Sequence, residues 1–264
     1  LLDHSRRRVK VILTLDLGNT DLFIGVIDDD KVIETYRTST DIHKSGDEYA
    51  FILKTFLKKH IENDDIEGII CSSVVPSLNL NLKMAIKRLF NKELLFVQSG
   101  LKTGLPIRID NPNELGADLV CDCVGAIAKY GYPIVIVDLG TASKILVVDK
   151  NGAYIGGTIS AGIKISIEAL ARKTANLSET SLDVPTKIIN KNTIDCINAG
   201  TILGEKIMIE GIVNKMEEEL GYKVKRVVTG GYSHIMPKLD DFTYDYDLVH
   251  FGLAIIYRKN VYEK

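Results

Sequence analysis

The hydrophobic pattern of this chain begins with residues that alternate between apolar and polar. Apolar side chains at every second position over 9–15, a turn of small residues at 16–20 and an apolar run over 22–27 predict two strands joined by a tight turn. A third strand is predicted over 31–36. Because short turns connect antiparallel neighbours, we expect a three-stranded antiparallel meander in this segment.

Helical periodicity follows these strands. An apolar stripe behind Asp47 and Glu48 predicts a helix over 47–57, since acidic residues favour the first turn of a helix. The pattern predicts further helices over 78–90, 119–130, 163–172, 193–220 and 248–258, and further strands over 68–75, 94–97, 134–137, 144–148, 153–155 and 224–228. The helix over 193–220 carries more apolar residues than one buried face needs, which predicts a homodimer.

A short motif occurs twice and predicts a duplicated fold. Asp16-Leu17-Gly18-Asn19-Thr20 follows the first strand, and Asp138-Leu139-Gly140-Thr141 follows the strand over 134–137, 122 residues later. Strands and then helices follow each copy, so we predict an α/β protein of two duplicated domains with a cleft between them. The expected domains are 9–120 and 121–264, which agrees with the ~150 residues of a typical domain.

Composition narrows the possible functions. The chain has 33 basic and 35 acidic residues and a net charge of −2, which argues against a broad surface for nucleic acid or anionic membranes. No stretch of about 18 residues is apolar throughout, and the apolar segment after Arg6-Arg7-Arg8 is too short for a signal peptide. The four cysteines lack zinc-type spacing, so we expect buried thiols in a reducing cytoplasm. The five histidines are scattered, which argues against metal-hydrolase chemistry.

Each repeated turn has the chemistry of a phosphate site. The backbone N–H groups of Gly18, Asn19 and Thr20 meet at one point, which suits phosphate oxygens. Asp16 would then hold a hydrated Mg²⁺ that bridges to the phosphates. An ordinary hairpin turn uses the same residue types, so a single copy leaves both interpretations open. Two facing copies would enclose a polyphosphate from both sides, which favours phosphate binding.

Two further positions each allow a structural and a functional interpretation. Asp118 precedes the helix over 119–130, where aspartate is a preferred N-cap residue. The same side chain could act as a general base that takes a proton from an alcohol attacking a γ-phosphate. Thr229-Gly230-Gly231 fits either a strand-to-helix turn or a place where a flat ring or a sugar approaches the backbone closely.

An ordered series of short motifs covers nearly the whole chain. The series reads DLGNT at 16–20, DEY at 47–49, SSVVP at 72–76, KTGLPIR at 102–108, DNP at 110–112, GAD at 116–118, DLGTA at 138–142, GGTI at 156–159, EAL at 168–170, KNT at 191–193, EGIV at 210–213 and TGG at 229–231. In this order, over residues 11–260, the sequence resembles a type III pantothenate kinase of the actin, hexokinase and heat-shock ATPase superfamily.

The resemblance implies a fold and an activity. The fold would be two duplicated RNase-H-like domains of the actin and hexokinase type. The activity would be ATP-dependent phosphorylation of pantothenate to 4′-phosphopantothenate, the first step of coenzyme A biosynthesis, in the cytoplasm. The implied cofactors are ATP, Mg²⁺ and a monovalent cation, either K⁺ or NH₄⁺. The implied assembly is a homodimer that binds pantothenate and ATP and neither nucleic acid nor a membrane.

The resemblance also implies roles for individual residues. Asp118 would be the catalytic base, and Asp138 would bind the monovalent cation. ATP would be bound by Asp16, which reaches Mg²⁺ through phosphate or water, and by Leu17, Gly18, Asn19, Thr20, Thr141, Gly230 and Gly231. Pantothenate would be bound by Ile109, Gly116, Ala117, Leu119 and Thr193.

The sequence departs from the family pattern at Ala161-Gly162, where the family has Pro-Gly, at Leu177-Ser178, where it usually has Leu-Pro, and at two positions of the pantothenate side. Leu119 stands where the family has arginine, and Ile109 stands where it commonly has tyrosine. A hydrogen bond to a charged partner is worth about 1.5–3 kcal/mol, so loss of the arginine predicts pantothenate binding that is roughly 10- to 150-fold weaker. The alternatives are a kinase for another small alcohol and a non-catalytic paralogue that binds nucleotide and has a regulatory role. Retention of Asp16, Asp118 and Asp138 favours an enzyme.

Overall fold

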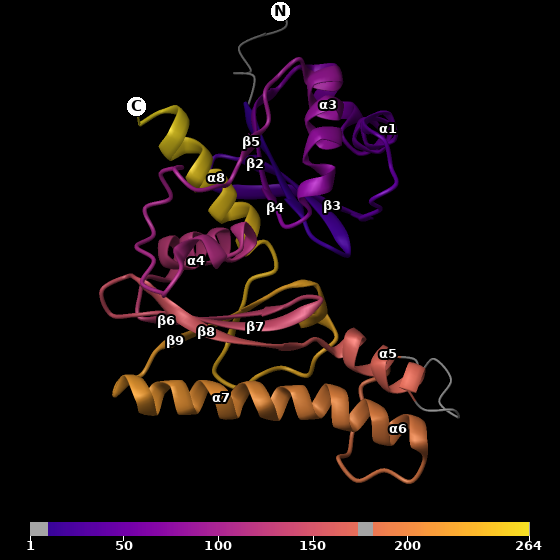
Figure 1. The fold of residues 1–264 in the computed structure, drawn as a ribbon, viewed down its shortest axis with the longest axis vertical. Coiled ribbons are helices and arrows are strands. Elements are labelled where there is room, and N and C mark those ends of the chain that lie inside the picture. The colour runs from indigo at the N-terminus through magenta and orange to yellow at the C-terminus, as the bar shows by residue number, and fades with distance from the viewer. Residues whose placement is uncertain (1–9, 174–181, 264) are drawn as a thin grey trace, which may run out of the picture. The chain divides into compact units, whose positions relative to one another are not determined.

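The computed structural model describes residues 10–173 and 182–263, and these form two compact units (Figure 1). The first unit contains the described residues up to Gly104, together with 113–125 and the C-terminal segment from Asp247. The second unit contains 105–112 and 126–246. The C-terminal segment from Asp247 therefore packs with the first unit, although it lies at the end of the range 121–264 that was expected to form the second domain.

The first unit is built on a five-stranded sheet in the order β3-β2-β1-β4-β5. The strands are β1 (Val11–Leu17), β2 (Asp21–Asp28), β3 (Lys31–Ser39), β4 (Ile66–Ser73) and β5 (Leu95–Phe96). β1, β2 and β3 pair antiparallel as the predicted meander, while β4 runs parallel to β1 and β5 runs parallel to β4.

The second unit repeats this topology. Its sheet has the order β10-β9-β6-β7-β8, with β6 (Ile134–Leu139), β7 (Ala142–Val148), β8 (Tyr154–Ala161), β9 (Lys225–Thr229) and β10 (Thr243–Tyr244). β6, β7 and β8 form an antiparallel meander, and β9 pairs parallel with β6. Strand for strand, the order matches that of the first sheet, which confirms the duplicated α/β fold predicted from the repeated motif.

Every predicted helix is present, but the short helix Lys58–Asn63 in the first unit was not predicted and one predicted helix in the second unit is divided. The helices are α1 (Gly46–Phe56), α2 (Lys58–Asn63), α3 (Asn79–Phe90), α4 (Ala117–Tyr130), α5 (Ile163–Lys173), α6 (Thr193–Asn198), α7 (Gly204–Leu220) and α8 (Leu248–Val261). The single helix predicted over 193–220 is divided by a π-helical turn, Ala199–Leu203, between α6 and α7. Gly200 and Gly204 lie at this turn and have low helix propensity, but hydrophobic periodicity alone does not reveal such a widening.

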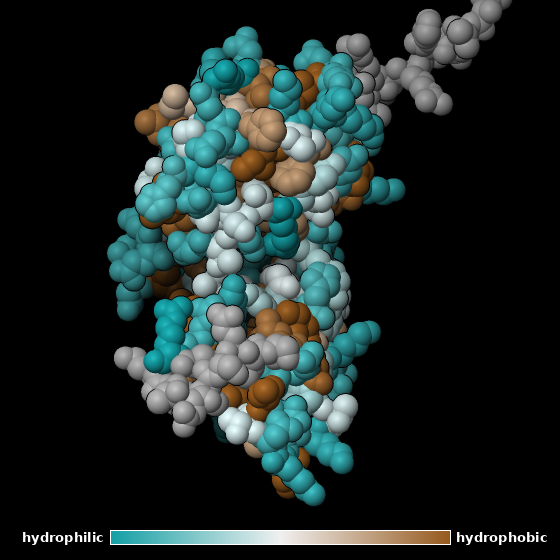
Figure 2. All heavy atoms as spheres, turned by 90° about the vertical axis from the view of Figure 1, so that its right-hand side faces the viewer, coloured by the Kyte–Doolittle hydropathy of each residue, from teal (hydrophilic) through white to brown (hydrophobic). Residues whose placement is uncertain are grey.

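Apolar side chains are exposed on the second unit around α5, α6 and α7. The exposed set comprises Ile159, Ile165, Leu170, Val184, Ile188, Ile189, Ile194 and Ile207. Figure 2 shows brown apolar side chains among polar ones in the lower part of its view. Among the described residues, no helix has the length and apolar character needed to cross a bilayer.

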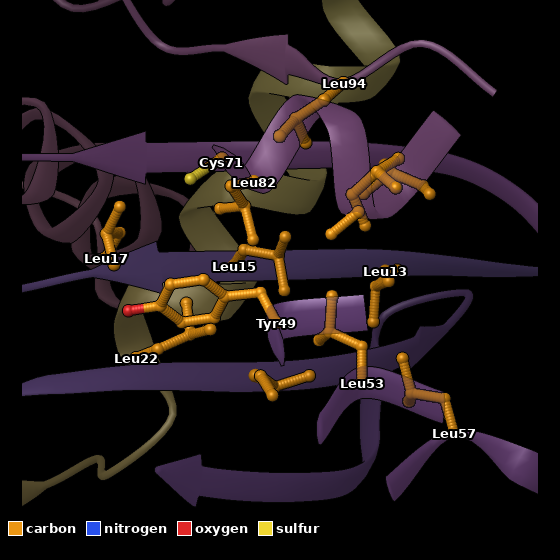
Figure 3. Close-up of a cluster of buried hydrophobic side chains, with 14 of the residues drawn as sticks. Leu13, Leu15, Leu17, Leu22, Tyr49, Leu53, Leu57, Cys71, Leu82 and Leu94 are labelled. Carbon is orange, nitrogen blue, oxygen red and sulfur yellow. The ribbon is translucent and has the colours of Figure 1, made fainter. Parts of the chain in front are cut away.

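The core of the first unit explains how β1 presents polar residues on its other face. Leu13, Leu15 and Leu17 of β1 are buried in a cluster with Tyr49 and Leu53 of α1 (Figure 3). Because side chains alternate along a strand, Thr14 and Asp16 point to the opposite face of the sheet. On that face α8 contacts β1 through a hydrogen bond between His250 and Thr14. Burial of the leucines thus determines which way the Asp16 carboxylate points.

Candidate active site

Asp16 is held at the end of β1 by its neighbour in β4. The two strands pair so that Asp16 lies beside Ser72, and the buried Ser72 hydroxyl donates a hydrogen bond of 2.7 Å to Oδ1 of Asp16. Ser72 belongs to the SSVVP motif at 72–76 but had no predicted role. The contact depends on the register of strands more than fifty residues apart in sequence, so no local pattern reveals it.

The turn after Asp16 is supported from outside by Thr40. The Thr40 hydroxyl donates to the Gly18 carbonyl at 2.7 Å, and the Thr40 amide donates to the Thr20 carbonyl at 2.8 Å. Within the turn, the Gly18 amide donates to the Asp21 carbonyl at 3.0 Å. Asn19 and Thr20 are exposed at the tip, whereas Leu17 is buried in the core. The turn therefore presents a fixed backbone and two polar residues to an incoming ligand.

Asp118 is the second residue of α4 and is not its N-cap. The helix begins at Ala117, and Gly116 precedes it. A Cβ atom on Gly116 would lie 2.4 Å from Oδ1 of Asp118, so only glycine leaves room for the carboxylate to lie back over the helix start. Asp118 therefore lies one residue inside the start of the helix, with its carboxylate beside Gly116.

Asp16 and Asp118 both belong to the first unit, and both influence the buried thiol of Cys121. Burial raises the pKa of the Cys121 thiol well above its usual value, and the negative charges of Asp16 and Asp118 raise this pKa further. Asp16 also adds to the effect of burial in raising the pKa of Cys71. Since charge interactions weaken with distance, both carboxylates must lie near the Cys121 side chain. Cys71, Cys121 and Cys123 are buried as predicted, but the expectation fails for Cys196, which is exposed on α6.

In the second unit, the turn that contains the repeated motif carries an ion pair. Asp138 lies directly opposite Lys144 in the antiparallel pairing of β6 with β7. The Lys144 ammonium is 2.8 Å from Oδ2 of Asp138 and donates a hydrogen bond to it. Lys144 had no predicted role. The sequence feature that could have revealed this pair is the symmetric spacing of residues 138 and 144 about a hairpin turn.

Gly230 packs closely against this second turn. Its φ of +91° belongs to the left-handed region that glycine tolerates. A Cβ atom there would lie 2.5 Å from the backbone nitrogen and oxygen of Leu139 and 2.6 Å from Oδ1 of Asp138. Gly231 begins the short 3₁₀ helix that follows, and Thr141 is exposed on the turn. Asp138, Thr141, Gly230 and Gly231 are therefore brought together at one end of the second sheet.

Comparison with known proteins identifies the family. Residues 12–215 match the family model for type III pantothenate kinase. The chain is 39% identical over 253 residues to a type III pantothenate kinase of Exiguobacterium sp., with 95% of this chain and 99% of the relative covered. The chain belongs to the type III pantothenate kinase family. The resemblance noted from the sequence motifs is thereby confirmed.

Solved structures show the same fold at lower identity. A conserved Baf family protein from Campylobacter jejuni gives a TM-score of 0.60 at 19% identity, with 94% of this chain and 98% of that chain covered. The ROK hexokinase of Thermus thermophilus gives a TM-score of 0.53 at 10% identity, with 96% and 100% covered. Together with the repeated sheet order, these matches confirm the hexokinase-type fold.

The residues expected to bind pantothenate in this type III pantothenate kinase do not all lie on one element. Gly116, Ala117 and Leu119 lie with Asp118 at the start of α4, and Leu119 is 7% exposed. Ile109 belongs to the second unit, where the Arg108 amide beside it donates to the Tyr154 carbonyl at 2.8 Å. Thr193 is exposed as the first residue of α6, directly after the N-cap residue Asn192.

The described residues fit a magnesium ion that arrives with its nucleotide. Among them, no group of three or more histidines, cysteines, aspartates or glutamates is arranged to hold a metal. Mg²⁺ commonly uses one or two carboxylates, several waters and substrate phosphates. Asp16, oriented by Ser72, supplies one such carboxylate beside the exposed turn at Asn19 and Thr20. This donor set suits a metal bound through water and phosphate.

Proposed function

We propose that this protein phosphorylates pantothenate with ATP to give 4′-phosphopantothenate, the first step of coenzyme A biosynthesis. Membership of the type III pantothenate kinase family supports the proposal. The observation that carries it is the Asp16 carboxylate, which Ser72 holds at the end of β1, with Asp118 at the start of α4 in the same unit, because one carboxylate can serve the metal and the other the attacking alcohol. A cytoplasmic location, expected for this pathway, stays a prediction.

The proposed mechanism assigns one task to each carboxylate. Asp118 accepts the proton of the pantothenate hydroxyl as its oxygen bonds to the γ-phosphorus of ATP, and ADP leaves with the electrons of the broken bond. Mg²⁺, when bound, neutralises charge on the transferring phosphoryl group. Asp16, fixed by Ser72, orients the water or phosphate ligands of that ion.

The proposed nucleotide contacts come from both turns. Leu17, Gly18, Asn19 and Thr20 offer phosphate contacts through the turn that Thr40 supports. In the second unit, Thr141 and the backbone at 230–231 contact the nucleotide, with Gly230 allowing close approach. A positive charge is needed at Asp138 beside the anionic nucleotide, and the family resemblance implies K⁺ or NH₄⁺ in this role.

An ADP-release assay with and without pantothenate tests the proposal. We expect ADP formation that depends on pantothenate and stops when Mg²⁺ is chelated. Release with another small alcohol and none with pantothenate would instead support a kinase of altered substrate. Nucleotide binding without release under any condition would support a non-catalytic paralogue. A product with the mass of 4′-phosphopantothenate completes the assignment.

The substitution Leu119→Arg is expected to lower the KM for pantothenate at least tenfold with little change in kcat. Arginine at this position would pair with the substrate carboxylate in the ground state and the transition state alike. Leu119→Gln, which adds a polar but uncharged side chain, should lower the KM for pantothenate much less. Because Leu119 is 7% exposed, the melting temperature of each variant is measured as well. Tight pantothenate binding by the wild type, made worse by arginine, would show that other residues hold the carboxylate.

We also propose a homodimer, formed through the second unit. Along the segment from α6 to α7, Ile202, Ile209 and Val213 are buried, whereas Ile194 and Ile207 are exposed. Exposed apolar area of this kind is typical of subunit contacts. Light scattering at micromolar concentration should give about twice the chain mass of 29.2 kDa. Ile207→Asp should shift the mass toward one chain, and a wild type of one chain mass would contradict the proposal.

A further inference from the structure

We infer that Lys144 supplies, from within the chain, the positive charge that the family resemblance assigns to K⁺ or NH₄⁺ at Asp138. This protein would therefore need no added monovalent cation. The inference rests on the proposed kinase function and concerns one position of its second turn. The observations behind it are the groups that lie against the Asp138 carboxylate, Lys144 and Gly230.

The ammonium of Lys144 lies on the Asp138 carboxylate because of strand register. Asp138 on β6 and Lys144 on β7 are direct cross-strand partners, and such partners project from the same face of a sheet. The distance from Nζ to Oδ2 is 2.8 Å, that of a charge-assisted hydrogen bond. The two side chains are only 19% and 13% exposed, so water screens this pair less than it screens a surface ion pair.

The remaining surroundings of Asp138 do not fit a separate monovalent ion. Its other oxygen, Oδ1, lies beside Gly230, which packs closely against the backbone of Leu139 and so narrows the space around this oxygen. An ion bound at Oδ2 would share that oxygen with an ammonium already 2.8 Å away. Two positive charges at such separation repel one another, and the ion would also have to lose part of its hydration shell. A free K⁺ or NH₄⁺ is therefore disfavoured at this carboxylate.

The lysine side chain offers the same chemistry as the ion it would replace. It ends in a compact primary ammonium with a single positive charge and three N–H donors. Since it is tethered to β7, its effective concentration at Asp138 does not depend on the salt in solution. The nearby Thr141 is a proposed nucleotide contact, which places the same charge next to the bound anion.

The test compares salts at constant ionic strength. Initial rates and the Kd for ADP, by calorimetry, are measured in KCl, NH₄Cl, NaCl and choline chloride. For the wild type we expect both quantities to agree within about twofold in all four salts. A rate or an affinity that rises tenfold or more on adding K⁺ would overturn the inference without any variant.

Two substitutions separate a cation substitute from a structural ion pair. Lys144→Met should weaken ADP binding roughly 10- to 150-fold in choline chloride, as expected for loss of a charged hydrogen bond, and K⁺ or NH₄⁺ should restore part of it in a saturable way. Lys144→Arg, which keeps the charge, should stay independent of K⁺. The matched control is Lys87→Met, which removes the lysine of an exposed pair with Glu93 at 2.9 Å and should change neither measurement.

The outcomes distinguish this inference from the proposed function. If Lys144→Met binds ADP with wild-type affinity in every salt, the pair of Asp138 and Lys144 is only a structural contact and the inference is overturned. Loss of folding in Lys144→Met, seen as loss of its melting transition, leaves the decision to the wild-type salt series and to Lys144→Arg. Salt-independent ADP binding without any phosphorylation of pantothenate would uphold the role of Lys144 and contradict the kinase assignment.

Discussion

The substitution Asp118→Asn is expected to lower kcat about 10²- to 10⁴-fold while leaving the melting temperature nearly unchanged. Asparagine has the size of aspartate but cannot accept the proton of the attacking alcohol. Asp118 is the second residue of α4, and its replacement by asparagine keeps the size of the side chain beside Gly116, so the fold should be preserved. The KM values for ATP and pantothenate should change much less than kcat, since the lost interaction arises in the transition state.

A matched control exists in the first unit. Asp47 is also the second residue of a helix, α1, and is exposed. Asp47→Asn removes the same favourable interaction with a helix N-terminus, worth about 0.3–1 kcal/mol, and an exposed ion pair with Arg88, without touching the proposed site. It should leave kcat unchanged. If Asp118→Asn also kept wild-type turnover, Asp118 would be an ordinary first-turn acid and the proposed base would have to be sought elsewhere.

The sequence was most informative where structure depends on local pattern. Alternation over 9–15 predicted β1 and, through the repeated turn, the whole meander and its copy at β6–β8. The buried leucines of β1 made that prediction reliable, because one face of the strand must enter the core. The π-helical turn at Ala199–Leu203 leaves the apolar period almost unchanged, so the sequence predicted one continuous helix there.

Contacts between distant strands could not be predicted in this way. Ser72 reaches Asp16 because β4 pairs with β1 in one particular register, and a shift by one residue would turn Ser72 to the other face. The pair of Asp138 and Lys144 depends in the same way on the register of β6 and β7. Motifs therefore predict which carboxylates belong to the site, while the partners that orient or neutralise them required the folded sheets.

The same face of β1 that presents Asp16 also carries a buried histidine contact. His250 of α8 is fully buried, and its Nδ1 lies 2.9 Å from the hydroxyl of Thr14. That hydroxyl donates its one proton to the Gly25 carbonyl at 3.0 Å, so Nδ1 of His250 must be the donor to Thr14. Nε2 is then an unprotonated nitrogen with no hydrogen-bond partner among the described residues. This arrangement requires a neutral imidazole.

The surroundings of His250 oppose its protonation. Burial, and then the positive charge of Arg37, lower the pKa of His250 to about 3. Arg37 lies over the Phe23 ring, 3.4 Å from its centroid, and Phe23 contacts the His250 ring with centroids 4.1 Å apart. A proton on Nε2 would therefore meet an aromatic and cationic environment in place of water or a carboxylate.

Acid is consequently expected to destabilise this protein through His250. An unfolded histidine has a pKa near ~6.5, so below that pH the unfolded chain binds a proton that the folded chain excludes. The contribution of neutral His250 is complete above pH ~6.5 and is lost as the pH falls toward the folded pKa of about 3. Within that window the free energy of unfolding should fall by up to about 1.4 kcal/mol per pH unit from this one group.

Urea unfolding at several pH values between 7.5 and 4.5 measures this slope, and two variants isolate its source. His250→Asn places an amide near the position of Nδ1 and can still donate to Thr14, but it does not titrate. It should be less stable than the wild type at pH 7.5 because part of the buried ring is lost. Its stability should nevertheless fall less steeply with pH, so that the two curves approach one another in acid. His43→Asn, at an exposed position, should keep the wild-type slope. Parallel curves for wild type and His250→Asn would contradict this prediction. They would mean that His250 is protonated as readily in the folded chain as in the unfolded one, whereas burial beside Arg37 should prevent this.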